Sequence, residues 1–328
     1  MSGIAVVMAT YDGARWLPEQ LASIAAQTRP PERLIVSDDG SGDETVALLE
    51  RFAEGARFPV QILRGPRAGV GDNFWHAAAV AGCDLVAWSD QDDVWHPAKL
   101  ERCARVLERT GCDLVSHSAT VVDQGLEPTG GRCPDYRRDA VLGALEGDPW
   151  HVPSGFASVF RRELLAGIDW DARPISHMTG RPVIHDHAIS LRAFAGGRRA
   201  SIAEPLARYR QHDANVHGDP TTHGLRSLRV AMGVGAAQFL QLADRARGYG
   251  RYVAALPGAD PGAADYFEAL ARRCERRAAV YECRSLPARA RSLAGALRRR
   301  VYAPRSDGAF GGLALAKDAV AIAMRSGR

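Results

Sequence analysis

Three carboxylates stand within four residues in the sequence SDQDDVW at residues 89–95. They are Asp90, Asp92 and Asp93, and the largely apolar run 84–88 before them is typical of a strand. Like charges this close repel one another, so we expect a positive partner among them unless all three point into water. A divalent cation held by oxygen ligands at a strand end is the simplest partner. A solvated acidic turn is the alternative.

The elements that must position these carboxylates follow from the pattern of the first 110 residues. Short apolar runs occur at 4–9, 34–36, 60–63 and 84–88. Each is followed by a loop and an amphipathic stretch, and the sequence SGDE at 41–44 predicts a helix with Ser41 as its N-cap. Strand, loop and helix thus repeat four times. This predicts an α/β fold with a mostly parallel sheet and helices on both faces.

Ligands of such sheets bind at the carboxyl ends of the strands. Polar clusters lie at these ends in this chain: Thr10 with Tyr11, Asp38 with Asp39, the segment 64–73 with Asn73, and 90–93. We therefore expect four polar clusters to converge on one rim of the sheet.

Beyond residue 112 the periodicity weakens. Strands are predicted at 113–117, 154–160 and 201–209, the last at a sheet edge because it contains Pro205. The sequence HDH at 185–187 precedes a helical run, 188–194, so Asp186 is a candidate helix N-cap. A polar stretch at 217–224 predicts a linker. These features divide the chain into a sheet domain, 1–218, and a helical Ala- and Arg-rich region, 225–328.

Bulk composition restricts the class of protein. The chain has 328 residues, 46% of them hydrophobic, and a net charge of +4, which gives no reason to expect nucleic-acid binding. Six cysteines include no Cys-x-x-Cys pair, so we expect reduced thiols and neither disulfides nor zinc. The N-terminus lacks the features of a signal peptide and no apolar run reaches spanning length, which predicts a cytoplasmic protein.

Taken together, the motifs resemble those of family 2 inverting glycosyltransferases of the GT-A fold, and within them the bacterial rhamnosyltransferase-like group. The resemblance covers about residues 4–218 and rests on ATYDG at 9–13, VSDDGS at 36–41, DNF at 72–74, SDQDDVW at 89–95, SG at 154–155, HD at 185–186, and YRQH at 209–212 with Asn215. Two positions depart from the group: Asp12 replaces its usual Asn, and Asp213 replaces a frequent Gly.

This resemblance implies roles for the residues at the rim. Thr10, Tyr11, Asp38 and Asp39 would bind the base and ribose of a nucleotide donor, and Asn73 would also lie on the donor side. Asp93 would contact the donor sugar or the acceptor region. Asp92, with Asp90, would hold Mg²⁺ or Mn²⁺ against the donor diphosphate, and His212 would complete that site. A surface histidine at a strand end is the alternative for His212.

An inverting transfer needs one base on the acceptor side. The resemblance assigns this role to Asp186, whose carboxylate is ionised at neutral pH when its pKa is ordinary. His185 and His187 are the fallback bases. The N-cap role remains the alternative for Asp186.

The expected donor is a dTDP- or UDP-sugar, with dTDP-L-rhamnose as the leading choice, and the expected acceptor is a saccharide or a lipid-linked precursor of a cell-surface polysaccharide. A haloacid-dehalogenase phosphatase would need its Asp-x-Asp early in the chain. A sugar nucleotidyltransferase would need a glycine-rich basic loop where residues 10–13 read TYDG. A non-catalytic nucleotide-sugar binding protein stays open.

The C-terminal region is strongly basic. Residues 270–305 contain eleven arginines and two glutamates. A helix from about Pro287 can place Leu286, Leu293, Ala296 and Leu297 on one face, with Arg289, Arg291, Arg298, Arg299 and Arg300 around it. Such a helix could lie on the anionic inner face of the cell membrane. It could equally be a solvated basic surface, or pack on the catalytic domain or on a second subunit of a homodimer.

Overall fold

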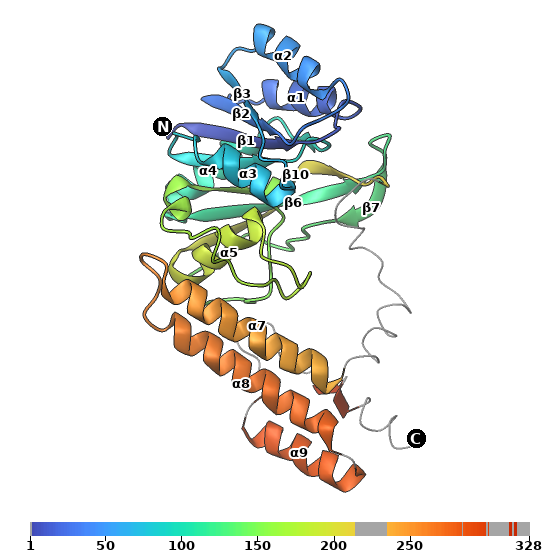
Figure 1. Cartoon of the computed structure of the whole chain (residues 1–328), viewed down its shortest axis with the longest axis vertical. Coiled ribbons are helices and arrows are strands. Elements are labelled where there is room, and N and C mark those ends of the chain that lie inside the picture. Colours follow the sequence, from blue (N-terminus) through green and yellow to red (C-terminus); the bar gives the residue numbers. More distant parts are fainter. Residues whose placement is uncertain are drawn as a thin grey trace.

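The four apolar runs near the N-terminus form the parallel half of a sheet (Figure 1). The computed structural model describes residues 2–213, 235–283, 285–299, 301, 315–316 and 318–319. The parallel strands are, in order across the sheet, β3 (Val60–Arg64), β2 (Arg33–Asp38), β1 (Ile4–Thr10) and β4 (Leu85–Ser89). Every residue of β1 and β4 is buried, as expected for strands covered on both faces.

The other half of the sheet is mixed in direction. It contains β9 (Ser158–Arg161), β6 (Leu114–Val122), β10 (Arg199–Arg210) and β5 (Val94–Trp95), with β7 (Pro128–Arg132) and β8 (Ala140–Leu142) beside them. β9 runs antiparallel between β4 and β6, whereas β6 and β10 are parallel. A sheet that is parallel over its first half and flanked by helices confirms the predicted α/β class.

Two strand predictions in this half need correction. Within the predicted strand 154–160, the short 3-10 helix η1 (Gly155–Ala157) comes first and β9 follows it. The prediction that the strand at 201–209 lies at the sheet edge is wrong, because β10 pairs with β6 on one side and with β8 and β5 on the other. Pro205 itself lies between the residues that pair with β8, 199–201, and those that pair with β5, 207–208. Pro205 is accommodated where the register with β6 shifts, since a bulge tolerates a residue without an N–H.

Helices cover both faces of the sheet, and alternate strand residues point to each face. One face carries α1 (Leu17–Ala25), α2 (Thr45–Gly55) and α4 (Lys99–Thr110), and the other carries α3 (Val70–Ala78) and α5 (His185–Gly196). On β1, Val6 and Met8 belong to the first apolar core and Ala5 and Val7 to the second. The short 3-10 helix η2 (Arg162–Leu165) follows β9.

The C-terminal region is helical, as predicted. Helices α7 (Ala236–Ala254) and α8 (Ala263–Glu282) lie side by side, and α9 (Leu286–Arg298) lies at their far end from the sheet (Figure 1). A third apolar core joins this pair to α5 and contains Phe194, Tyr249 and Phe267. The predicted linker 217–224, the mark at Asn215 and the predicted domain boundary lie outside the described residues.

Two bulk expectations can be compared with the structure. None of the described helices combines the length and the apolar character needed to cross a membrane. All six cysteines are free thiols, and Cys83, Cys103, Cys112 and Cys274 are buried.

A buried histidine marks the contact between α5 and α7. His187 is 3% exposed and lies within ring-contact distance of His177 and Tyr249, at 5.5 Å from each. Burial lowers the pKa of His187 to about 4. An unfolded histidine has a pKa of about 6.5, so below that pH the unfolded chain binds a proton that the folded chain excludes. Stability contributed by this contact is therefore lost as the pH falls from about 6.5 towards 4.

We predict that replacing His187 by Leu reduces the acid sensitivity of the fold. The pKa difference implies that this residue removes about 2 kcal/mol from the free energy of unfolding between pH 7.5 and pH 5. Urea unfolding of the wild-type protein and of His187→Leu at both pH values measures the difference. Equal losses of stability in the two proteins would show that His187 is not the responsible group.

Candidate active site

The predicted convergence of polar clusters is present at the carboxyl ends of the parallel strands. The strand registers place Thr10 beside Asp38 and Asp38 beside Arg64, and β4 ends next to β1, directly before Asp90. This rim is where an α/β sheet binds its ligands.

Asp38 organises the loop after β2. Its carboxylate accepts hydrogen bonds from Thr10 Oγ1 (2.8 Å), from Ser41 Oγ (2.5 Å) and from the backbone N–H groups of Gly40 and Ser41. Ser41 is thus part of this loop and is not a helix N-cap, which corrects the sequence prediction, because α2 begins only at Thr45. Asp38 is 6% exposed, so its main observed role is to fix the chain around it.

Asp39 holds the loop that follows β3. Its two oxygens accept hydrogen bonds from the backbone N–H groups of Arg67 (2.7 Å) and Gly69 (2.8 Å). Tyr11, in contrast, is 59% exposed on the same rim. Of the residues predicted to bind the base and ribose, Tyr11 therefore presents the most accessible surface.

Asn73 lies beneath the rim and is 1% exposed. Its amide donates to Ser37 O (2.8 Å) and Thr10 O (3.3 Å), which ties the ends of β1 and β2 together. Gly65 packs so closely here that a Cβ would stand 2.6 Å from Asn73 Oδ1 and 2.7 Å from Asp38 O. The hydrogen bonds of Asn73 hold the ends of β1 and β2 in place. Contact of Asn73 with a donor stays a prediction.

The three carboxylates of the Asp-x-Asp segment lie in a crowded negative site. Burial, with the charges of Asp92 and Asp186, raises the pKa of Asp90 to about 8. Burial and the two neighbouring aspartates raise the pKa of Asp93 well above its usual range. Asp93 is fully buried, and its Oδ1 accepts a hydrogen bond from the backbone N–H of Arg210 (3.1 Å). Asp93 therefore faces the protein rather than an open donor site.

A buried lysine supplies part of the expected positive partner. Lys99 is fully buried, donates from Nζ to Phe156 O (2.5 Å) and places Nζ 3.4 Å from the centre of the Trp95 ring. Burial lowers the pKa of Lys99 to about 7, while the charges of Asp93 and Asp90 act in the opposite direction.

Arg210, at the end of β10, holds the backbone of the Asp-x-Asp segment in place. It is 1% exposed, donates from Nε to Asp92 O (2.8 Å) and from a terminal nitrogen to Gln124 O (2.7 Å), and pairs with Glu19. Its guanidinium also lies 4.6 Å from the centre of the Trp16 ring. This arginine joins the Asp-x-Asp segment to the start of α1 and to the loop after β6. In the sequence, Arg210 stands out only as part of the YRQH mark at 209–212.

His212 reaches the carboxylate that it was predicted to assist. Its Nε2 lies 2.9 Å from Asp92 Oδ2, and its ring stacks on Trp16 at a centroid distance of 5.1 Å. The part of the chain that the structure describes holds no group of three or more His, Cys, Asp or Glu side chains arranged as metal ligands. A Mg²⁺ site needs only one or two carboxylates when substrate phosphates complete it. The crowded carboxylates, whose mutual repulsion a cation would relieve, fit such a site.

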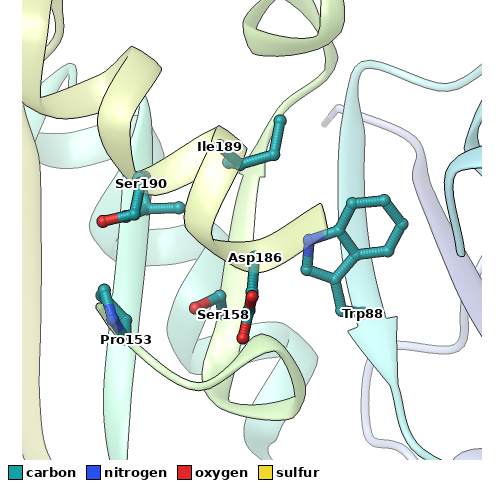
Figure 2. A pocket seen from close by; sticks show the side chains of 7 residues that line it. Trp88, Pro153, Ser158, Asp186, Ile189 and Ser190 are labelled. Carbon is teal, nitrogen blue, oxygen red and sulfur yellow. The ribbon is translucent and has the colours of Figure 1, made fainter. Parts of the chain in front are cut away.

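Asp186 lies in the first turn of α5 on the same side as this cluster, close enough for its charge to raise the pKa of Asp90. It is not the N-cap, since Ile184 occupies that position. Asp186 Oδ1 accepts a hydrogen bond from the N–H of His187 (2.6 Å). Figure 2 shows its side chain beside Trp88 and Ser158, at a narrow pocket that has no room for a water molecule.

The two fallback bases are enclosed by aromatic rings. His185 stacks on Phe74 at 3.9 Å and meets the Trp88 ring edge at 5.1 Å, whereas His187 faces α7. A Cβ on Gly155 would lie 2.8 Å from His185 Nε2 and 3.4 Å from Asp186 Cβ. The small residue of the Ser-Gly mark thus lets η1 pack against the start of α5.

Comparison with known proteins gives a consistent result. The sequence profile described as glycosyl transferase family 2 matches residues 5–168. The uncharacterized glycosyltransferase alr2836 of Nostoc sp. is 29% identical over 218 residues, which are 65% of this chain and 66%, just under two thirds, of that protein. The dTDP-rhamnosyl transferase RfbG of Shigella flexneri is 34% identical over 226 residues, which are 64% of this chain and 73% of that protein.

Among solved structures, Staphylococcus aureus TarS, residues 1–349 in complex with UDP, is similar with a TM-score of 0.55. The alignment covers 83% of this chain and 90% of that chain at 16% sequence identity. An identity this low shows a shared fold.

We predict that Arg210 is a major source of stability at the rim. Arg210→Met removes the side-chain hydrogen bonds to Asp92 O and Gln124 O and the ion pair with Glu19. It should lower the free energy of unfolding by about 1–3 kcal/mol, the scale for leaving buried acceptors without a partner. The control is Arg208→Met, an exposed residue of the same strand, which should change stability by less than about 0.5 kcal/mol. Urea unfolding compares them. Similar stabilities of the two variants would contradict the assigned role.

Proposed function

Since the chain belongs to glycosyl transferase family 2, we propose that it is an inverting enzyme that moves a sugar from a nucleoside-diphosphate donor to a hydroxyl group of a saccharide or lipid-linked acceptor. The observation that carries this proposal is the position of Asp186. The Asp186 carboxylate lies beside the carboxylates that follow β4, at the edge of the sheet where α/β folds bind their ligands. A protein that only bound nucleotide sugars would not need this arrangement.

The donor lies along the rim, with its base at the end of β1 and its diphosphate at Asp92. Tyr11 offers its exposed ring to the base, and Thr10, Asp38 and Asp39 hold the surrounding loops. Asp92 and Asp90, with His212, would hold Mg²⁺ or Mn²⁺, and the cation would neutralise negative charge on the departing diphosphate. Arg210 fixes the backbone of Asp92, so this carboxylate is positioned before the donor binds.

Asp186 removes the proton of the acceptor hydroxyl. Because Oδ1 already accepts the His187 N–H, we assign the proton to Oδ2. The hydroxyl oxygen bonds to the anomeric carbon while the bond from that carbon to the diphosphate oxygen breaks, so the configuration at the carbon inverts. The tight packing around Trp88 keeps water away from the back of this carboxylate.

The donor class is supported by two relatives. The Shigella relative is described as a dTDP-rhamnosyl transferase, which favours dTDP-L-rhamnose as donor. The TarS structure contains UDP, so a UDP-sugar is the second choice. A saccharide or lipid-linked acceptor makes cell-surface polysaccharide synthesis the fitting pathway class.

We also propose that α9 binds the anionic inner face of the membrane, where a lipid-linked acceptor is found. Arg291, Arg298 and Arg299 are exposed, as is Leu297 at 45%. The predicted apolar face is partly used inside the protein, because Ala296 and Leu293 pack in a small cluster with Val280 and Val301. The contact with lipid is therefore electrostatic, with little insertion.

Removal of the metal-site carboxylate should abolish transfer without unfolding the protein. Asp92→Asn keeps the shape of the side chain but lacks its charge, and EDTA should inhibit the wild-type enzyme until Mn²⁺ or Mg²⁺ is restored. Release of nucleoside diphosphate measures turnover, and thermal unfolding checks the fold. The control is Asp84→Asn, an exposed carboxylate at the other end of β4. Full activity of the wild type in EDTA would remove the metal from the mechanism.

Loss of the base should affect turnover and spare donor binding. Asp186→Asn can still accept the His187 N–H but cannot take a proton, so kcat should fall by at least about 10²-fold while donor affinity stays within about twofold. His187→Leu is the matched control, because that ring faces α7, and it should retain turnover. The reverse pattern, with His187→Leu inactive and Asp186→Asn active, would move the base to His187.

Membrane binding should depend on the basic side of α9. The variant with Arg291, Arg298 and Arg299 all changed to Gln should bind vesicles containing phosphatidylglycerol about 10²-fold more weakly, because each arginine contributes about 1 kcal/mol near an anionic surface. Co-sedimentation at low and high salt measures this. The control changes three arginines far from α9, Arg132, Arg137 and Arg138, to Gln. Equal binding by the two triple variants would contradict the proposal.

A further inference from the structure

The middle residue of the Asp-x-Asp segment, Gln91, makes two hydrogen bonds to the backbone of a residue 80 positions earlier. Gln91 Oε1 accepts from the N–H of Tyr11 (3.0 Å), and Gln91 Nε2 donates to the carbonyl oxygen of Tyr11 (3.0 Å). One side chain thus satisfies both backbone groups of Tyr11. Two hydrogen bonds fix the orientation of the Gln91 amide relative to the Tyr11 backbone, whereas a single bond would let the amide rotate about that bond.

Gly13 provides the space for this amide. A Cβ at Gly13 would lie 2.1 Å from Gln91 Oε1, 2.4 Å from Gln91 Cδ and 3.0 Å from Gln91 Nε2. Gly13 is not among the residues with positive φ, so its backbone conformation is open to alanine. The close contact with Gln91 therefore explains why residue 13 is a glycine, whereas its backbone conformation does not require one.

The other bonds of this loop run to the segment after β2. The backbone N–H of Asp12 donates to Ser41 Oγ (2.9 Å), and that of Gly13 donates to Thr45 Oγ1 (2.8 Å). These bonds fix the β1–α1 loop to the β2–α2 region. Gln91 fixes the same loop to the segment that carries Asp92.

We propose that Gln91 is a positioning residue that holds Tyr11 at a fixed distance from Asp92, and that Gly13 is required because it admits the Gln91 amide. The inference rests on the proposed function, in which Tyr11 meets the base of the donor and Asp92 its metal-bound diphosphate. A nucleoside diphosphate touches both ends of this unit at once. Alignment of the two ends before binding lowers the ordering cost that the donor must overcome.

The test is a double-mutant cycle on Gln91 and Gly13, read out as the Kd of UDP and dTDP in Mn²⁺ by calorimetry. Gln91→Ala removes both bonds and should raise Kd about tenfold. Gly13→Ala should do the same, because the added methyl displaces a flexible side-chain end and leaves the fold intact. In the double variant the methyl has no amide to displace, so Kd should again rise about tenfold rather than about a hundredfold.

Two further readouts separate positioning from general loss of structure. In turnover assays the donor KM should rise about tenfold with kcat within about threefold, the pattern for lost binding without lost chemistry. Hydrogen exchange at the Tyr11 amide should accelerate in Gln91→Ala and stay unchanged in Gln61→Ala, an exposed glutamine on β3.

A hundredfold effect in the double variant, or wild-type affinity in either single variant, would overturn the inference. Failure of the wild-type chain to bind any nucleoside diphosphate would instead overturn the proposed function. In that case the exchange rate of the Tyr11 amide still decides whether Gln91 holds the loop.

Discussion

The repulsion among carboxylates at the carboxyl end of β4 determines much of the surrounding structure. Burial raises the pKa values of Asp90 and Asp93, and neighbouring carboxylates raise them further: Asp92 and Asp186 act on Asp90, and Asp92 and Asp90 act on Asp93. Isolated charges at such positions would be very unfavourable, so the fold supplies compensating groups. Lys99 comes from α4, and the backbone N–H of Arg210 donates to Asp93 from the end of β10. The proposed divalent cation would bind at Asp92 and Asp90 and would stabilise the ionised form of both carboxylates.

The rim around this cluster is built largely from polar groups that bind the backbone. Asp38, Asp39 and Asn73 hydrogen-bond to the backbone of neighbouring loops. Tyr11, on the same rim, has a large exposed surface. Loops fixed in this way stay in place when a ligand arrives. The resulting rigidity favours catalysis, because reacting groups that are positioned in advance lose less entropy on binding.

The local parts of this arrangement could be predicted from the sequence. Apolar runs gave the parallel strands, and the rule for strand ends placed Thr10, Asp38 and Asp90 at one rim. Long-range contacts could not be predicted, because the hydrogen bond from the Arg210 backbone N–H to Asp93 spans 117 positions and nothing in the local pattern encodes it. The prediction that Ser41 caps a helix failed because the Ser41 hydroxyl binds the Asp38 carboxylate instead. The predicted edge position of β10 failed because β8 and β5 pair with its two ends, and Pro205 lies in the gap between them.

The central claim is that this rim transfers a sugar, and a donor screen tests it most directly. The purified chain is incubated with Mn²⁺, a saccharide acceptor mixture and a panel of nucleotide sugars that includes dTDP-L-rhamnose and UDP-sugars, and release of nucleoside diphosphate is followed. The account predicts catalytic, acceptor-dependent release from one donor class. Stoichiometric binding of a nucleotide sugar without any release would contradict it and identify a binding protein instead.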